Sequence, residues 1–366
     1  MKTLYVINSP SWTEIDPSGL NNSEMFGGPL SENFTYFYYN LMKFGLVNEV
    51  KIFVENHRWR VGKYVSDTLI TDFGKMKLLK DDNKFDIINS DKSYNFVFCW
   101  SNILECQNIK NKFVIVDNQF NGYIKKSDVN SQIHDFVLSE SQNFIDKYIP
   151  KDVPSFPYKL ISYDHENVKS KTNNQNKIYD WVMISSFDKR KRHIEFLNLL
   201  KRQSLSKLKG CIIARDPNNK KKKIFDHLKR NTPWKIYNVV QRLKKNMNFD
   251  LFLNIHQDKK IELTNKSKVF VNCSVLDSGP RAQVEAMQLN IPVITMPHVG
   301  SSDIIQNGRN GIIAERFSDI PSYLLKIINN YSNFDRISND DYLKPENLYP
   351  NIVKNIQLNY KKKNVQ

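Results

Sequence analysis

The sequence predicts an α/β protein with two parallel-sheet domains and a C-terminal helix. Strand-like apolar runs alternate with helix-like segments along the chain, which is typical of a parallel sheet covered by helices on both faces. The alternation stops in the polar stretch KSKTNNQNK (169–177) and then begins again. The chain has 366 residues, enough for two domains of ordinary size.

The first domain is predicted over residues 1–168. Short runs rich in Val, Ile and Phe favour buried strands, and longer runs with apolar residues at helical spacing favour helices. The candidate elements are LYVI (4–7), ENFTYFYYNLMKFG (32–45), EVKIFV (49–54), YNFVFCW (94–100), KFVIV (112–116), HDFVLSESQNFIDKYI (134–149) and FPYKLISYDHENV (156–168). Residues 169–178 have no apolar periodicity, and we interpret them as an interdomain linker.

The second domain is predicted over residues 179–333, where the same alternation recurs. Its candidate elements are YDWVMIS (179–185), HIEFLNLLKR (193–202), GCIIA (210–214), FDLFLNI (249–255), KVFVNCS (268–274), RAQVEAMQL (281–289) and PVITM (292–296). The tail, residues 334–366, has turns predicted at Pro345 and Pro350 and then a helix over residues 351–363.

The chain is strongly basic, with 54 Lys and Arg against 38 Asp and Glu and a formal net charge of +16. Such a charge attracts polyanions, which include nucleotide diphosphates, anionic lipid headgroups and nucleic acid. The richness in Lys, Asn, Ile, Phe and Tyr is also what an AT-rich genome favours, so coding bias remains an alternative origin of the charge.

Neither the cysteines nor the histidines show the spacing of a metal site. We therefore expect no bound metal and no tightly bound cofactor, and reduced, buried thiols at Cys99, Cys106, Cys211 and Cys273. No apolar run approaches the roughly 20 residues that span a bilayer. A cytoplasmic protein is expected, with peripheral contact at the inner face of a membrane left open.

The most informative segment is DSGPRAQVEAMQLNIPVITMPHVGSSDIIQNGRNGIIAE (277–315). In it a strand leads through an acidic loop, which begins at Asp277 and contains Gly279, into a helix from about Arg281. A helix N-terminus suits a phosphate or a sugar hydroxyl, and a glycine lets the backbone approach the ligand closely. Taken alone, the segment favours an ordinary loop with an acidic helix cap.

The wider string resembles the retaining glycosyltransferases of family 4, the glycosyl transferases group 1. Two acids stand eight residues apart, and a series of family positions follows them in register. The matching residues are Asp277, Glu285, Ala286-Met287, Pro292-Val293-Ile294, Gly300, Asp303, Asn307-Gly308 and Asn310-Gly311. The resemblance implies a GT-B fold, in which two Rossmann-like domains face each other across a cleft. Residues 179–333 would bind a nucleotide-sugar donor and residues 1–168 the acceptor.

The resemblance also implies roles for single residues in the donor domain. Glu285 resembles the glutamate that holds the ribose hydroxyls, and Asp277 the acid that orients the transferred sugar, although the family more often has Glu there. The backbone from Ser278 through Gly279 and Pro280 to Arg281 would lie along the sugar and the diphosphate.

A basic pair that grips the diphosphate is also expected, and Lys191 stands at the place of its lysine. Ser186 stands where the family has an arginine, so Lys189, Arg190 or Arg192 are alternatives for the second charge. Preorganised cations stabilise negative charge as it develops on the leaving diphosphate. The candidate catalytic residues are therefore Asp277, Lys191 and Glu285.

Site candidates in the first half are fewer. Gly27 and Gly28, before a predicted helix, resemble the family's glycine-rich loop beside the acceptor and phosphate. Many family members have a histidine after a later strand of this domain, and here Asp117 and Asn118 stand at that place. We expect these two residues to line the cleft.

These patterns together favour a retaining, metal-independent glycosyltransferase. It would use a UDP-sugar or a GDP-sugar and a glycan or lipid-linked glycan acceptor. Two alternatives remain open. The acceptor could be a base in DNA, with the Lys-rich segment 218–231 and Arg58-Trp59-Arg60 along the phosphates. The chain could instead be a non-catalytic polyanion-binding protein with a degenerate GT-B fold, as the departures at Ser186 and Asp277 suggest.

Overall fold

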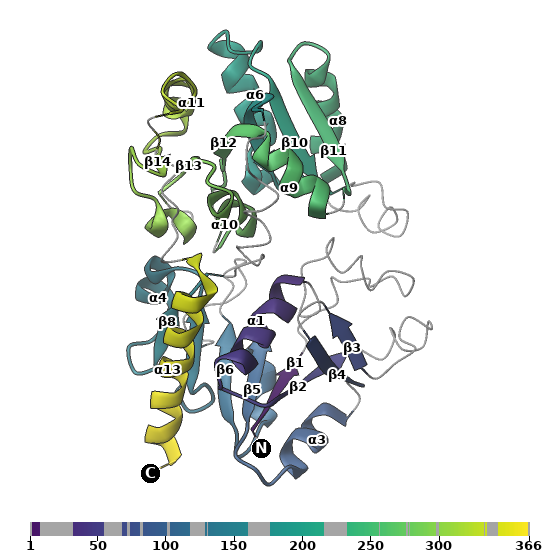
Figure 1. Cartoon of the computed structure of the whole chain (residues 1–366), viewed down its shortest axis with the longest axis vertical. Helices are drawn as coiled ribbons and strands as arrows, with labels where there is room; N and C mark the ends of the chain where they lie inside the picture. The colour runs from purple at the N-terminus through teal and green to yellow at the C-terminus, as the bar shows by residue number, and fades with distance from the viewer. Residues whose placement is uncertain are drawn as a thin grey trace. The chain divides into compact units, whose positions relative to one another are not determined.

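Two sheets, each flanked by helices, organise the chain (Figure 1). The structure is a computed structural model that describes residues 2–7, 32–54, 68–71, 74–80, 83–100, 103–117, 129, 131–159, 176–215, 233–255, 257–275, 277, 279–297, 300–332, 334 and 343–364. One compact unit comprises Met1–Tyr163 with Tyr342–Gln366, and the other comprises Asp164–Asp341. The C-terminal helix thus belongs to the first unit.

In the first unit the sheet has the strand order β3-β4-β2-β1-β5-β6-β7-β8. Its neighbouring strands are parallel, except that β3 and β4 form an antiparallel pair. The elements of this unit are β1 (Thr3–Ile7), α1 (Glu32–Lys43), β2 (Glu49–Val54), β3 (Thr68–Thr71), β4 (Gly74–Lys80), α3 (Lys84–Ser90), β5 (Phe96–Trp100), η3 (Ile103–Asn108), β6 (Phe113–Asp117), β7 (Phe136–Ser139), α4 (Gln142–Tyr148), β8 (Ser155–Pro157) and α13 (Pro345–Asn364).

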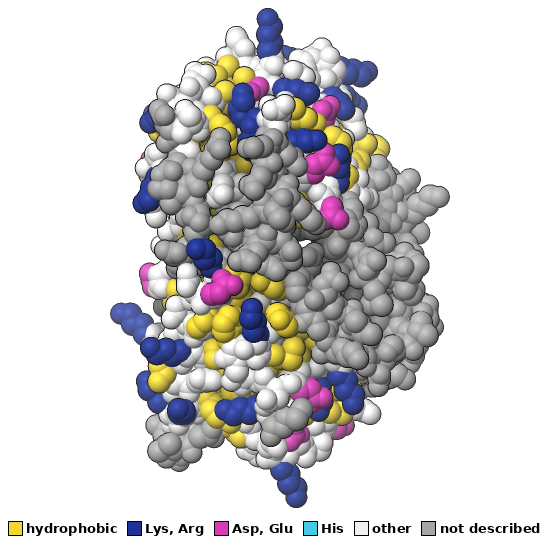
Figure 2. Space-filling view, in the orientation of Figure 1, with side chains coloured by type: hydrophobic (Ala, Val, Ile, Leu, Met, Phe, Trp, Pro, Cys, Tyr) yellow, Lys and Arg dark blue, Asp and Glu magenta, His cyan; other side chains and the backbone are white. Residues whose placement is uncertain are grey.

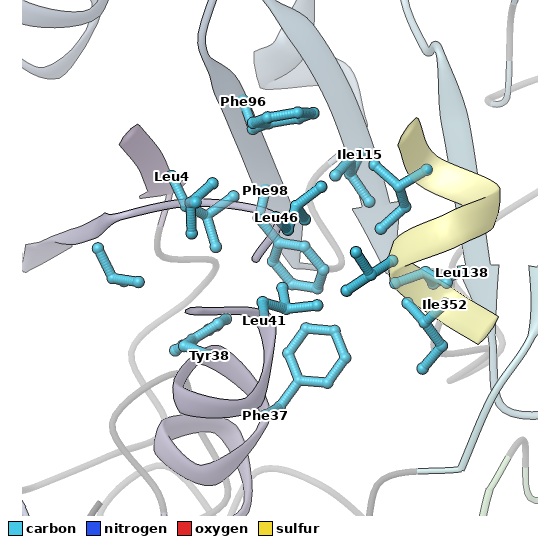
Figure 3. Packing of buried hydrophobic residues seen from close by; sticks show 14 of the residues in the cluster. Leu4, Phe37, Tyr38, Leu41, Leu46, Phe96, Phe98, Ile115, Leu138 and Ile352 are labelled. Atoms are coloured by element: carbon cyan, nitrogen blue, oxygen red, sulfur yellow. The ribbon is translucent and has the colours of Figure 1, made fainter. Parts of the chain in front are cut away.

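The core of this unit is rich in aromatic side chains, several of which are shown in Figure 3. Phe37 of α1 lies against Phe98 of β5, with ring centroids 5.6 Å apart. The ring centroid of Phe37 also lies 5.8 Å from that of Tyr349 of α13. Ile352, one turn further along α13, is fully buried in the same cluster. The C-terminal helix is therefore part of the core that supports the first sheet.

The helix α13 differs from the expectation at Pro350. The sequence predicted a turn there, but α13 begins at Pro345 and continues through Pro350. A proline inside a helix removes one backbone hydrogen bond. Here Leu348, Tyr349 and Ile352, on either side of it, are buried in the core, and this burial outweighs the lost bond.

In the second unit all strand pairs are parallel, and the order is β11-β10-β9-β12-β13-β14. Its elements are β9 (Tyr179–Ile184), η5 (Lys189–Lys191), α6 (His193–Arg202), β10 (Gly210–Ala214), α8 (Pro233–Lys244), β11 (Phe249–Leu253), α9 (Gln257–Asn265), β12 (Ser267–Val271), α10 (Arg281–Gln288), β13 (Val293–Thr295), η7 (Gly300–Ile304), β14 (Gly311–Ile313), η8 (Phe317–Asp319) and α11 (Ile320–Asn329).

Trp181 of β9 is the largest fully buried side chain of this unit. Its ring lies 5.1 Å from that of Phe196 on α6, so it joins the sheet to the helix. Gly210 is required beside it, because a Cβ atom at that position would lie 2.0 Å from the indole ring. The strand β10 can pair closely with β9 only because this residue has no side chain.

Two further expectations can be compared with the structure. All four cysteines are buried, as predicted. Among the described residues, no helix combines the length and the apolar character needed to cross a bilayer.

Candidate functional site

The strand order of the second unit creates a place for a ligand at its carboxyl edge. From β9 the chain builds outward to β10 and β11, and it then returns to the other side of β9 to form β12. In parallel α/β sheets, ligands bind outside the carboxyl ends of the strands at such a reversal of order. The loops that follow β9 and β12 flank this point, and they contain the predicted Lys191 and Asp277.

Lys191 and Asp277 form an ion pair between Nζ and Oδ2, although they are 86 positions apart in the chain. The side chains are only 17% and 15% exposed, so water screens their attraction incompletely. Backbone contacts fix both loops, since the amide of Gly300 donates to the carbonyl of Asp277 at 2.7 Å and that of Lys191 to Asp188 at 3.0 Å. The structure therefore brings together the two residues at the centre of the prediction.

A direct contact holds the two loops together. The amide of Val275, after β12, donates to the carbonyl of Arg190, after β9, at 2.9 Å. Behind it, Asn272 Nδ2 donates to Gln283 Oε1 on α10 at 2.9 Å, within the buried interior. These bonds fix the start of α10 relative to the end of β12. They therefore hold Asp277, which lies between the two elements, in a defined position relative to the helix.

Glu285 lies on α10, where its side chain is 5% exposed and pairs with Lys260 Nζ of α9 at 2.7 Å. Arg281 begins α10 after Pro280 at the N-cap, so it stands four residues before Glu285 on the same helix face. Gly279 and Pro280 form the half-buried approach to the helix. Ser278 is outside the described residues.

The two arginines of the basic turn after β9 contact different side chains. Arg190 is directed to Asp188, with Nη2 and Oδ2 3.0 Å apart, and its Nε lies 3.3 Å from both carboxylate oxygens. The guanidinium of Arg192 lies over the ring of Phe317 at 4.8 Å. Ser186 is exposed at the end of β9.

A buried histidine supports the same edge. His193 begins α6, and its Nε2 lies 3.1 Å from Ser185 Oγ. Burial, together with the positive charge of Lys191, lowers the pKa of His193 to about 3, although Asp188 opposes this. The imidazole is therefore neutral at physiological pH. If Nε2 has the proton, it donates to Ser185 Oγ and leaves the serine hydroxyl hydrogen available to a ligand.

Comparison with protein families identifies the second unit. Residues 164–340 match the family "Glycosyl transferases group 1". The second unit is a group 1 glycosyltransferase domain. The chain is therefore a glycosyltransferase, and a nucleotide-sugar donor is the substrate that this family implies. No curated protein sequence matches the chain.

The glycosyltransferase also has the GT-B fold over its whole length, as comparison with solved structures shows. Sucrose-phosphate synthase from Thermosynechococcus elongatus has a TM-score of 0.64 and 12% identity, with 100% of this chain and 99% of that chain covered. HepE from Anabaena, in complex with UDP-glucose, has a TM-score of 0.57, 8% identity and full coverage of both chains. The lipopolysaccharide outer core galactosyltransferase WaaB has a TM-score of 0.57, 11% identity and coverage of 99% and 100%.

Three charged or polar residues of this edge were not singled out from the sequence of the glycosyltransferase. Lys260 is placed by its pairing with Glu285, Arg215 follows β10, and Ser185 contacts His193. Ser185 and His193 flank the basic segment that follows the first predicted strand of this domain. Their position at the end of a strand could have marked them as candidates. Lys260 lies in a polar segment with no distinctive spacing, and no local signal marks it.

Candidates in the first unit are described only in part. Asp117 ends β6 and is completely buried. Burial and then the charge of Asp117 raise the pKa of the Tyr38 hydroxyl and that of the Tyr158 hydroxyl. Gly27, Gly28 and Asn118 lie outside the described residues.

The features that suggested nucleic acid stay untested. The segments 58–60 and 218–231 lie outside the described residues. In the view of Figure 2, Lys and Arg side chains are distributed over the described surface and do not gather in one patch. Within the described ranges, no group of three or more His, Cys, Asp or Glu side chains is arranged to hold a metal ion.

Proposed function

We propose that this glycosyltransferase transfers a sugar from a UDP-sugar to a hydroxyl group of a glycan or lipid-linked glycan, with retention of configuration. The observation that supports the site is the Lys191–Asp277 ion pair at the reversal of strand order, beside the helix that contains Glu285. UDP is favoured as the nucleotide because HepE, of the same fold, is known in complexes with UDP and with UDP-glucose.

Each part of the donor meets a matching group in this arrangement. The diphosphate lies beside Lys191 and Arg281, whose positive charges offset its negative charge. The ribose hydroxyls donate to the carboxylate of Glu285, which can only accept hydrogen bonds when ionised. The sugar hydroxyls donate to Asp277, which Lys191 holds in place through the ion pair.

The reaction requires one bond to break and one to form at the anomeric carbon. The bond from this carbon to the phosphate oxygen breaks, and the electron pair stays on the diphosphate. The acceptor oxygen bonds to the carbon on the same face, and its proton passes to the departing phosphate oxygen. Lys191 and Arg281 contribute by stabilising the charge that develops on the diphosphate.

Calorimetric titration with UDP, GDP, ADP and their sugar derivatives tests the donor site. We expect UDP to bind the wild-type chain, and Lys191→Ala to weaken that binding by about tenfold or more. Lys201→Ala, which removes an exposed lysine at the end of α6, is the matched control. If GDP binds more tightly than UDP, the proposed donor becomes a GDP-sugar. Failure of every nucleotide diphosphate to bind would refute it.

The acceptor is tested separately, by release of UDP from the UDP-sugar in the presence of candidate acceptors. The net charge of +16 suits the anionic surface of the cytoplasmic side of a membrane, where lipid-linked acceptors are found. We expect anionic vesicles that contain a lipid-linked glycan to accelerate release more than the same vesicles without it. Stimulation by duplex DNA alone would instead support a DNA-modifying enzyme.

A further inference from the structure

The contact between Ser185 and His193 joins the end of β9 to the start of α6. Ser185 directly follows β9, and its amide donates to the carbonyl of Ile213 on β10 at 3.1 Å. His193 is the first residue of α6, and its Nε2 lies 3.1 Å from Ser185 Oγ. Regular secondary structure therefore holds the backbone at both ends of this contact, which gives the serine hydroxyl a defined place at the carboxyl edge of the sheet.

The two nitrogens of the His193 ring have different surroundings. Nε2 meets the Ser185 hydroxyl, whereas Nδ1 is buried and has no hydrogen-bond partner within the described part of the chain. The ring packs against Phe187, with ring centroids 5.1 Å apart. A neutral imidazole has one N–H group, and buried N–H groups without a partner are rarer than unpaired acceptors. The proton therefore belongs on Nε2, which donates to Ser185 Oγ.

This position of the proton determines what the serine can donate. A hydroxyl that accepts a hydrogen bond from an imidazole still has its own hydrogen to donate. Among the described residues, His193 is the single hydrogen-bond partner of Ser185 Oγ. Ser185 is half-buried, so a ligand at the carboxyl edge can reach its hydroxyl. An acceptor oxygen of such a ligand can therefore take the serine hydrogen.

The segment between β9 and α6 favours a phosphate oxygen as this acceptor. The same segment contains Lys191, whose ammonium group is the one proposed for the diphosphate. Ligands of parallel α/β sheets bind at the carboxyl ends of the strands where the strand order reverses, and β9 is the strand at this reversal. A hydrogen bond to a charged phosphate oxygen is stronger than one to a neutral oxygen.

We propose that His193 is a positioning residue for the Ser185 hydroxyl, and that this hydroxyl donates a hydrogen bond to a phosphate oxygen of the donor. This inference rests on the proposed function, because it adds a contact to the same diphosphate subsite. Negative charge grows on the diphosphate when the bond to the anomeric carbon breaks. A donor that is already oriented stabilises this charge without having to reorganise during the reaction.

The contact with phosphate is tested by calorimetry with UDP and by displacement of UDP with uridine. Ser185→Ala should weaken UDP binding by about 10- to 100-fold and leave uridine binding unchanged, because uridine has no phosphate. Ser185→Thr keeps a hydroxyl and should retain most of the affinity. Ser204→Ala, at an exposed serine beyond the far end of α6, is the matched control and should bind UDP normally. Normal UDP binding by Ser185→Ala, or an equal loss for UDP and uridine, would overturn the inference.

The positioning by His193 is tested with a double-mutant cycle. His193→Leu removes the N–H group and should weaken UDP binding by about tenfold in the wild-type background. In the Ser185→Ala background the same change should have no effect, because the hydroxyl that His193 orients is absent. His193→Gln keeps an N–H donor and should bind UDP nearly as the wild type does. An equal effect of His193→Leu in both backgrounds would show a merely structural role and would overturn the positioning.

Nitrogen NMR of the wild type, labelled at histidine, measures the position of the proton in the intact protein. The signals of His193 are those that disappear in His193→Gln. At about pH 7 we expect a neutral ring with a protonated Nε2 and a bare Nδ1, and a proton on Nδ1 would overturn the inference even if His193→Leu did not fold. Failure of the wild type to bind any nucleoside diphosphate would instead overturn the proposed function itself.

Discussion

The buried His193 should make the second unit lose stability in acid by an amount that the structure allows to be calculated. In the folded chain its pKa falls from 6.5 to about 3 because the ring is 1% exposed and Lys191 is near. The unfolded chain has the ordinary value of about 6.5. Below about pH 6.5, His193 binds a proton in the unfolded chain but stays neutral in the folded chain. Lowering the pH therefore favours unfolding until the pKa of the folded chain is reached.

The magnitude follows from the width of this window. Each pH unit between the two pKa values changes the free energy of unfolding by about 1.4 kcal/mol. Lowering the pH from about 6.5 to about 4.5 therefore removes about 3 kcal/mol of stability through His193 alone. Other groups titrate in the same range, so the measured quantity must be the difference between the wild type and a variant without this group.

His193→Gln supplies that reference, because glutamine keeps an N–H donor for Ser185 and does not titrate. Urea unfolding at about pH 7 and about pH 4.5 gives the free energy of unfolding of both proteins. Tryptophan fluorescence, to which the buried Trp181 of β9 contributes, reports the transition. We expect the advantage of the wild type over the variant to shrink by about 3 kcal/mol in acid. An advantage that is the same at both pH values would refute the argument.

Four further predictions concern binding, catalysis and packing. Glu285→Ala should weaken UDP binding by about 30-fold or more, since hydrogen bonds to a charged group are lost; unchanged affinity in calorimetry would remove Glu285 from the ribose site. Lys191→Ala should lower kcat by about 100-fold, measured as UDP release, and a normal kcat would show that its charge has no role in the reaction. Gly210→Ala should lower the melting temperature of the second unit by several degrees, because the new Cβ atom meets the Trp181 ring at 2.0 Å; an unchanged melting temperature would contradict this packing. Tyr349→Phe should preserve or raise the melting temperature, because the buried hydroxyl has no hydrogen-bond partner within the described structure, and a marked decrease would reveal a partner.

The elements that could be predicted from the sequence are those whose burial is visible as a short run of apolar residues. Strands such as Phe113–Asp117 are apolar on both faces because helices cover both sides of a parallel sheet. The antiparallel pair Thr68–Thr71 and Gly74–Lys80 alternates with polar residues and was missed. The helix Gln257–Asn265 was missed as well, because its nine residues have little amphipathic character.

The candidate site divides in the same way. Asp277 and Glu285 stand in one contiguous string, so spacing alone brings them to attention. Lys260 comes from another element, α9, and only packing brings it to Glu285. No local pattern contains that information, since it depends on which elements are neighbours in the fold.

The order of the strands brings residues from separate loops into one candidate site. Because β9 lies between β10 and β12, the loops that follow these three neighbouring strands lie at the same edge of the sheet. The shorter acid, Asp277, reaches Lys191 from the β12 loop. Lys191 and Asp277 form an ion pair, so the group proposed for the diphosphate and the group proposed for the sugar are in direct contact. The side chain at position 277 should consequently affect the position of Lys191 as well as the choice of sugar.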